Sequence, residues 1–150
     1  MPRNPNAYSD AVQAAVDAEI GPVLQSFVAD YSFAQQGGAI ATIALTGKLI
    51  IPAGAVIVGG YVDITTPLTS GGAATIAMQV EAANDILTAV AVASWTAGRK
   101  NVLPAPATGA LTASTYVKTT AARDISIVVA AAALTAGAFR VVLFTETNPQ

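Results

Sequence analysis

The sequence contains neither cysteine nor histidine. Without cysteine the chain cannot form a disulfide, a thiolate nucleophile or a cysteine metal site, although this identifies no redox compartment. Without histidine it lacks the commonest general base, the commonest transition-metal ligand and the catalytic triads built on that side chain. These two absences argue against a hydrolase or a zinc enzyme. We therefore expect a protein that is not an enzyme and that uses no metal or cofactor.

Charged residues are scarce, at 11% of the 150 residues, whereas an average protein has about 25%. Seven basic and nine acidic side chains give a net charge of −2. The basic residues are scattered and only Arg99 and Lys100 are adjacent, so no nucleic-acid partner is predicted. So little charge is unusual for a free monomer. It favours a surface partly covered by copies of the chain or by a larger assembly.

Long apolar runs are also missing, although the mean hydropathy is +0.57. The longest, residues 125–139, is interrupted by Ser126, Thr135 and Gly137, and a membrane-spanning helix needs about 20 apolar residues. The first ten residues have no apolar core of a signal peptide. The sequence thus predicts no membrane partner and no export by a signal peptide.

The clearest structural signal lies in residues 48–65. Pro52 and Gly54 fit a tight turn, which predicts a hairpin between residues 49–51 and 55–65. The second arm alternates in a period of two, as a strand buried on one face does. The glycine pair Gly59-Gly60 within it indicates a bulge or a close approach of two backbones.

The remaining chain predicts a mainly β protein. Short β-compatible runs, about eight in all, are separated by turn signals roughly every ten residues, which favours an antiparallel β-sandwich of jelly-roll type over residues 34–147. Residues 86–94 fit either a short helix or a strand, with a slight preference for helix. Residues 148–150 are expected to form a free C-terminal tail.

Residues 1–33 have a different composition and are predicted to form an N-terminal, partly helical arm. Helix formers dominate residues 7–20, and the Gly21-Pro22 pair can end one helix and start another over residues 22–30. The spacing suits an arm that packs on a neighbouring subunit, or equally a helix lying on its own sandwich. The candidate interface residues are the apolar stripe of this arm together with one aromatic and one cation further on: Val12, Val16, Ile20, Val23, Phe27, Tyr31, Trp95 and Arg99.

No candidate catalytic or metal site emerges from the remaining polar residues. Glu81 and Asp85 could contribute to a Ca²⁺ site, but capping or solvation of a loop is favoured because Ca²⁺ needs six to eight oxygens. Asp63 is expected to be exposed or paired with a basic neighbour. Trp95, followed by Arg99 and Lys100, could bind a sugar or a protein surface, although core packing is the favoured interpretation.

Three stretches carry a resemblance to a known class: LIIPAGAVIVGGYVDITTPLTSGG, ANDILTAVAVASWTAG and ISIVVAAAALTAGAFRVVLF. In their style of turns and strands they resemble the small all-β structural proteins of tailed bacteriophages, most of all capsid decoration (cement) proteins. The resemblance covers roughly residues 39–144. It implies a compact β domain on the outer capsid surface, a homotrimer, the major capsid protein or another virion protein as partner, and synthesis in the bacterial cytoplasm. The predicted N-terminal arm departs from a bare cement domain.

The leading hypothesis is therefore a non-enzymatic virion component that decorates the outside of a capsid as a homo-oligomer. A tail adaptor, or the foot of a head fibre or spike, with the same fold is the second hypothesis. A carbohydrate-binding module is the third, and the single tryptophan argues against it.

Overall fold

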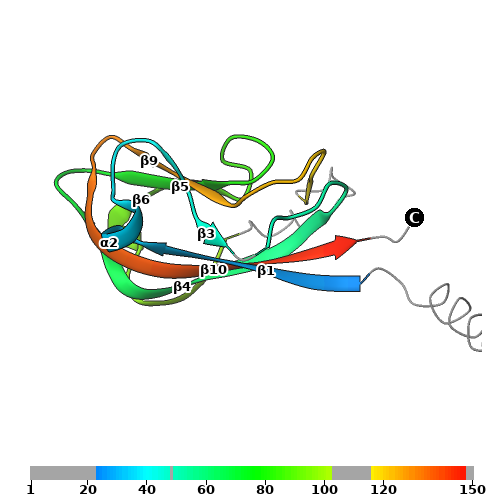
Figure 1. The fold of residues 1–150 in the computed structure, drawn as a ribbon. Coiled ribbons are helices and arrows are strands. Elements are labelled where there is room, and N and C mark those ends of the chain that lie inside the picture. Colours follow the sequence, from blue (N-terminus) through cyan, green and yellow to red (C-terminus); the bar gives the residue numbers. More distant parts are fainter. Residues whose placement is uncertain (1–22, 48, 103–115, 148–150) are drawn as a thin grey trace, which may run out of the picture.

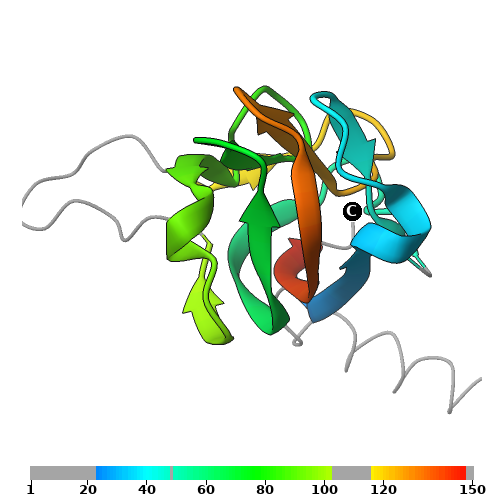
Figure 2. The same cartoon turned by 90° about the vertical axis from the view of Figure 1, so that its left-hand side faces the viewer.

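A computed structural model describes residues 23–47, 49–102 and 116–147, which fold into two antiparallel sheets packed face to face (Figures 1 and 2). The described residues form ten strands, one short α-helix and one 3₁₀ turn. In chain order these are β1 (Val23–Ser32), α2 (Phe33–Gln36), β2 (Thr42–Ala44), β3 (Thr46–Gly47), β4 (Val56–Ser70), β5 (Thr75–Gln79), β6 (Leu87–Ala91), η1 (Val92–Ser94), β7 (Gly98–Asn101), β8 (Val117–Lys118), β9 (Ser126–Ala130) and β10 (Leu134–Thr147).

Sheet A has the strand order β3-β1-β10-β4-β7, with β8 also paired to β4, and sheet B has the order β2-β9-β5-β6. The mainly β class with antiparallel sheets is thus confirmed, and the sandwich description fits loosely. The jelly-roll description fits only loosely, because an eight-stranded jelly roll differs from the six-stranded and four-stranded sheets of the described chain. Among the described residues, no helix is long and apolar enough to cross a membrane.

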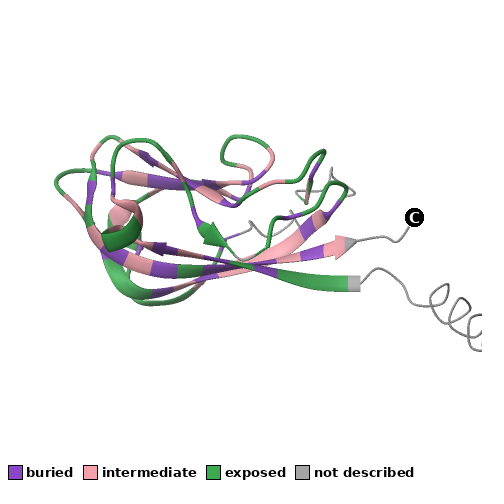
Figure 3. Cartoon of the chain, in the orientation of Figure 1, coloured by how far each residue is buried: buried purple, intermediate pink, exposed green. Residues whose placement is uncertain are grey.

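The core lies between the two sheets, and buried positions alternate with less buried ones along β1 and β9 (Figure 3). On β10, Phe139, Val141 and Leu143 point inward and are at most 2% exposed, as the alternation of that strand predicts. The rings of Tyr31 and Trp95 pack on Phe139, with centroids 5.1 and 5.2 Å from it. The Tyr31 hydroxyl donates a hydrogen bond to the Gly37 carbonyl at 2.8 Å.

The helix predicted over residues 22–30 is wrong for its described part, since residues 23–32 form β1. This strand pairs with β10 without a break from Val23 to Ser32, so it is an interior part of sheet A and not an arm. The sandwich therefore includes residues 23–33, which the predicted boundary at residue 34 assigned to the arm. Residues 1–22 and 148–150 lie outside the described residues.

The turn at Pro52 is confirmed, but the predicted hairpin is not formed. Gly54 has φ of +81°, and the Ala55 N–H donates to the Pro52 carbonyl at 3.4 Å. Residue Ile51 forms its bridge with Arg123, whereas β4 pairs with β10 on one side and with β7 and β8 on the other. Long-range partners thus replace the local pairing.

The glycine pair of β4 does mark a bulge. The pairing with β10 shifts between Phe144 and Thr145, and the buried positions of β4 change from Ile57 before the pair to Val62 after it. At Gly60 the backbone of β10 comes so close that a Cβ atom would lie 2.8 Å from the Val142 carbonyl oxygen. Both expectations for this pair, a bulge and a close backbone approach, are confirmed.

Residues 86–94 contain no α-helix. Residues 87–91 form strand β6 on the edge of sheet B, and only residues 92–94 turn helically, as 3₁₀. The slight preference for a helix was wrong, because pairing with β5 outweighs the local helix-forming residues.

Candidate functional site

The outer face of sheet A, the side turned away from sheet B, carries the most organised set of exposed side chains. Strand β1 contributes Leu24, Ser26 and Val28 to this face, while Phe27 and Tyr31 point into the core. The exposed half of β1 appears in green in Figure 3. The alternation of a strand therefore gives sheet A a chemically distinct second surface.

Four charged residues cross the outer face in one line, which we call the charge row: Asp30, Arg140, Asp63 and Arg99. They lie on β1, β10, β4 and β7 in direct register, so that each is opposite the next. The signs alternate along the line, which is the favourable order for directly opposite residues. Only an alternating order of two acids and two bases makes all three neighbouring pairs attractive.

The contacts within the charge row are strongest at its β1 end. The Arg140 guanidinium donates two hydrogen bonds to the Asp30 carboxylate, at 2.7 and 3.0 Å. That hydrogen-bonded carboxylate raises the pKa of Arg140. At the other end, Arg99 Nη2 lies 3.7 Å from Asp63 Oδ2, and the guanidinium carbon lies 4.3 Å from the centre of the Tyr61 ring. Such a cation–π contact helps to hold Arg99 flat on the sheet.

A second row, which we call the apolar row, lies beside the charge row. Each of its members is two residues away from a charged residue on the same strand. Val28, Val142, Tyr61 and Asn101 are in direct register across the same four strands. Val142 is only 7% exposed, although it faces away from the sandwich core. The Tyr61 and Phe144 rings lie next to each other, with centroids 6.0 Å apart. The outer face is therefore apolar beside its line of charges.

A groove of about 300 Å³ lies where the outer face meets the β3 edge, and it is partly apolar. Val28 and Leu49 are the hydrophobic residues that line it, and Leu49 is 67% exposed. The next residue, Ile50, is 57% exposed. Large exposed aliphatic side chains grouped near a sheet edge are typical of a surface that another protein covers.

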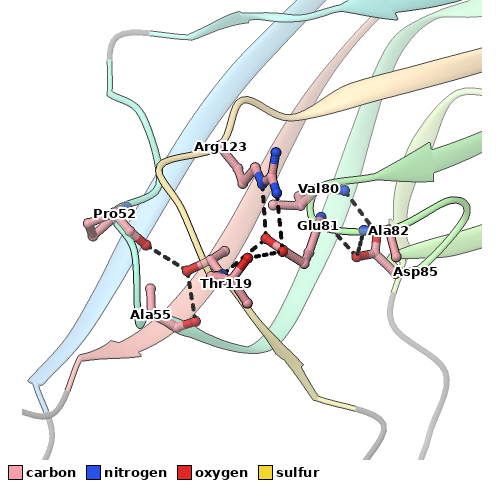
Figure 4. Close-up of polar contacts among 9 residues, drawn as sticks. Pro52, Ala55, Val80, Glu81, Ala82, Asp85, Thr119 and Arg123 are labelled. Atoms are coloured by element: carbon pink, nitrogen blue, oxygen red, sulfur yellow. Dashed lines mark hydrogen bonds and ion pairs between the residues drawn. The ribbon is translucent and has the colours of Figure 1, made fainter.

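A second polar cluster ties three loops together at one end of the sandwich (Figure 4). The Glu81 carboxylate accepts hydrogen bonds from Arg123 Nε and Nη2, at 3.0 and 3.2 Å, and from the Thr120 backbone N–H and hydroxyl. These hydrogen bonds lower the pKa of Glu81 to about 2, and the bond with Arg123 has the largest effect. Asp85 accepts from the backbone N–H groups of Val80, Glu81 and Ala82 at 2.8–2.9 Å. The capping role predicted for this loop is confirmed for Asp85.

The Glu81 and Asp85 carboxylates accept hydrogen bonds from donors of the same chain, which gives them a structural role. Among the described residues, no three acidic side chains gather as metal ligands would. The Thr119 hydroxyl completes the cluster, 2.6 Å from the Pro52 carbonyl oxygen and 3.2 Å from that of Ala55. The cluster thus fixes the loops around residues 52, 81 and 120 to one another.

The predicted interface residues lie in different environments. Val12, Val16 and Ile20 fall outside the described residues, and Val23 is the first residue of β1. Phe27 and Tyr31 belong to the core, as does Trp95 at 3% exposure, so core packing is confirmed for the tryptophan. Only Arg99 lies on the outer face, in the charge row. The pairing predicted for Asp63 is confirmed, with Arg99 as its partner.

Sequence reasoning missed most of the outer face, namely Asp30, Arg140, Leu24 and Val28. The signal available was the alternation of polar or exposed residues with Phe27, Ala29 and Tyr31 in β1. The partners themselves could not be identified from spacing, because Asp30 and Arg140 are 110 positions apart in the chain.

No protein-family model and no curated protein matches the sequence. Three solved structures have chains with a similar fold. One in the capsid of Ralstonia phage GP4 has a TM-score of 0.58 and 19% identity over 88% of this chain and 89% of that chain. One in the cyanophage Pam1 capsid asymmetric unit has a TM-score of 0.56 and 19% identity over 85% and 86% of the two chains. One in the acid-stable capsid of Helicobacter pylori bacteriophage KHP30 has a TM-score of 0.55 and 10% identity over 85% and 90%.

At identities of 10–19% these comparisons concern the fold. In each pair the alignment takes in nearly all of both chains, so the similar chains are also close to this one in length. A fold similar to this one therefore occurs in a chain of each of three phage capsids, over 86–90% of that chain.

Proposed function

We propose that this chain is a non-enzymatic structural protein of a phage virion, which decorates and cements the outer surface of the capsid as a homo-oligomer. The observation that carries the proposal is the match of almost the whole chain to almost whole chains found in three phage capsids. A structural role that acts by binding also agrees with a sequence that offers no histidine or cysteine for common catalytic chemistry.

The mechanism is additive burial of surface over many copies. The exposed aliphatic side chains at the β3 edge, Leu49 and Ile50 above all, provide apolar area to cover. Each Å² of apolar area removed from water contributes about 25 cal/mol, before the costs of ordering are subtracted. A modest contact repeated across a shell therefore strengthens the whole shell. The resemblance in sequence style adds the expectation of three chains per oligomer, bound to the major capsid protein.

The experiment is performed on virions of the phage that encodes this chain. Antibodies against the chain should label the heads of intact particles in electron micrographs, and particles lacking the chain should release DNA at a lower temperature. Labelling of tails or fibres would instead make the chain an adaptor. The absence of the chain from purified virions would overturn the proposal.

A further inference from the structure

We propose that the outer face of sheet A is a contact between two copies of this chain, stacked face to face about a two-fold axis that runs along the strands between β10 and β4. The inference rests on the self-association in the proposed function and names the surface that performs it. Charge complementarity of the face with itself is the observation that carries it.

The order of charges in the charge row decides the geometry. Across β1, β10, β4 and β7 the row is negative, positive, negative, positive. A two-fold axis along the strands reverses this order in the second copy. Asp30 of each copy then faces Arg99 of the other, and Arg140 faces Asp63. All four facing pairs are attractive, as an interface with itself requires.

The same row disfavours an axis that runs along it. A two-fold axis that lies in the sheet plane and follows the charge row across the strands would place every charged residue of the row opposite its own copy. Four like-charge pairs would then meet, which is unfavourable. The charge row therefore specifies one orientation of the second copy as well as permitting contact.

The apolar row supports the same arrangement. Under the axis along the strands, Val142 of one copy faces Tyr61 of the other, near the centre of the contact, and Val28 faces Asn101. The partly exposed Tyr61 therefore supplies the apolar contact near the centre, since Val142 is only 7% exposed. The charged side chains remain accessible to a second copy, since those of the row are 44–63% exposed.

The contact is expected to be small. Four strands about 5 Å apart make a face narrower than about 20 Å. We expect this narrow face to bury less area than a standard interface, which buries about 800 Å² per partner. Pairing in solution should therefore be weak and concentration-dependent. A threefold assembly formed through other surfaces would be joined to its neighbours by this contact.

Cross-linking tests the geometry directly, because any cysteine introduced is unique in this chain. Three variants are needed: Val28→Cys, Tyr61→Cys and Asn101→Cys. A bis-maleimide with a reach of about 10 Å, the spacing of stacked sheets, is added to concentrated protein. We expect a Val28→Cys and Asn101→Cys mixture to cross-link, and Tyr61→Cys to cross-link with itself. Val28→Cys alone and Asn101→Cys alone should not, since each lies about 17 Å from its own copy.

Each other pattern overturns the proposal. Cross-linking of the mixture without Tyr61→Cys would indicate that the copies meet in another orientation. Equal cross-linking of all variants with themselves would indicate unspecific collision. No cross-linking at all would show that the face is not a contact between copies.

A charge variant with a matched control tests the role of the row. Asp63→Lys, introduced into the Tyr61→Cys protein, should reduce cross-linking at least several-fold, because the introduced ammonium group would face Arg140 of the second copy. Asp124→Lys makes the same change of charge at an exposed position just before β9 and should leave cross-linking unchanged. High salt should weaken cross-linking of the unaltered row, which checks the charge effect without a variant. Equal behaviour of both variants and no effect of salt would overturn the role of the charge row.

These results separate the two proposals. Loss of cross-linking in a protein that still labels virion heads would refute the face-to-face contact alone. Specific cross-linking of a protein absent from virions would refute the capsid function alone.

Discussion

At the scale of single residues, two buried threonines differ in whether the hydroxyl of the side chain has a hydrogen-bond partner. Thr145 is 0% exposed, and its hydroxyl has no hydrogen-bond partner in the described part of the chain. Thr119 is 1% exposed, and its hydroxyl lies within hydrogen-bonding distance of two carbonyl oxygens. A buried polar group costs free energy when it is unpaired and little when it is paired.

We predict that Thr145→Val raises the free energy of unfolding by about 1 kcal/mol, because valine keeps the shape and removes the unpaired hydroxyl. Thr119→Val is the matched control and should lower the free energy of unfolding by about 1–3 kcal/mol, since the facing carbonyls lose the hydroxyl as a donor. Urea denaturation at neutral pH measures both. A destabilised Thr145→Val protein would show that the hydroxyl has a partner after all.

Glu81 gives the protein a predictable response to acid. Its folded-state pKa of about 2 lies below its ordinary value of 4.5, chiefly because of Arg123. The stabilisation is therefore complete above pH 4.5 and is lost as the pH falls through about 2. We expect Glu81→Gln to be less stable at neutral pH and to lose less stability than the wild type between pH 4.5 and about 2.

Thermal unfolding across that pH range is the measurement. The double variant Glu81→Gln/Arg123→Gln should be little worse than either single variant, because both remove the same interaction. Identical pH profiles of the wild type and Glu81→Gln would contradict the role assigned to this carboxylate.

At the scale of elements, the glycine pair of β4 allows a matched comparison of neighbouring positions. A Cβ at Gly60 would lie 2.6 Å from Leu143 Cδ2 and 2.8 Å from the Val142 carbonyl oxygen. A Cβ at Gly59 would lie 3.7 Å from Phe144 Cδ2, an ordinary van der Waals distance. The two glycines therefore differ in what they permit, although both lie beside the same bulge.

We predict that Gly60→Ala lowers the free energy of unfolding by about 1–3 kcal/mol, as overpacking in a well-packed core does. Gly59→Ala should be neutral or slightly stabilising, because alanine reduces the freedom of the unfolded chain. Chemical denaturation of the two variants side by side makes the comparison. Equal losses would mean that the pair is needed for backbone conformation and not for the close approach at Gly60.

The error in β1 has a specific physical cause. Val23, Phe27 and Tyr31 recur every four residues, and four is a period of a helix and also a multiple of the strand period of two. The local pattern was therefore compatible with both structures. The strand forms because ten residues of β10 pair with it, and that partner is far away in the sequence.

The better predictions depended on local chemistry. The Pro52 turn and the bulge at the glycine pair follow from neighbouring residues, and the structure has both. The charge row depends on the register of four strands from distant parts of the chain. One of its two acidic members, Asp63, was expected to be exposed or paired with a basic neighbour, but nothing local places Arg99, Arg140 and Asp30 in one line with it.

At the scale of the whole molecule, the position of β1 determines where the chain can be shortened. We predict that a protein beginning at Val23 keeps cooperative unfolding, since every strand pairing of the described residues remains. A protein beginning at Ala34 should fail to fold, because it lacks the strand between β3 and β10. Circular dichroism with thermal melting distinguishes these outcomes. A stable fold without residues 1–33 would contradict the central place of β1.

The pairing of β1 with β10 also governs when the protein can fold during its synthesis. The first described strand finds its ten-residue partner in the last one, so that neither has its full complement of backbone hydrogen bonds until both have been made. Contacts so distant in sequence cost more in loop closure than local ones do and form slowly. On the ribosome, β1 and β4 emerge long before β10. Until β10 has been made, the backbone groups with which they pair to it have no strand partner. Completion of the last strand is therefore the event that commits the chain to its sandwich.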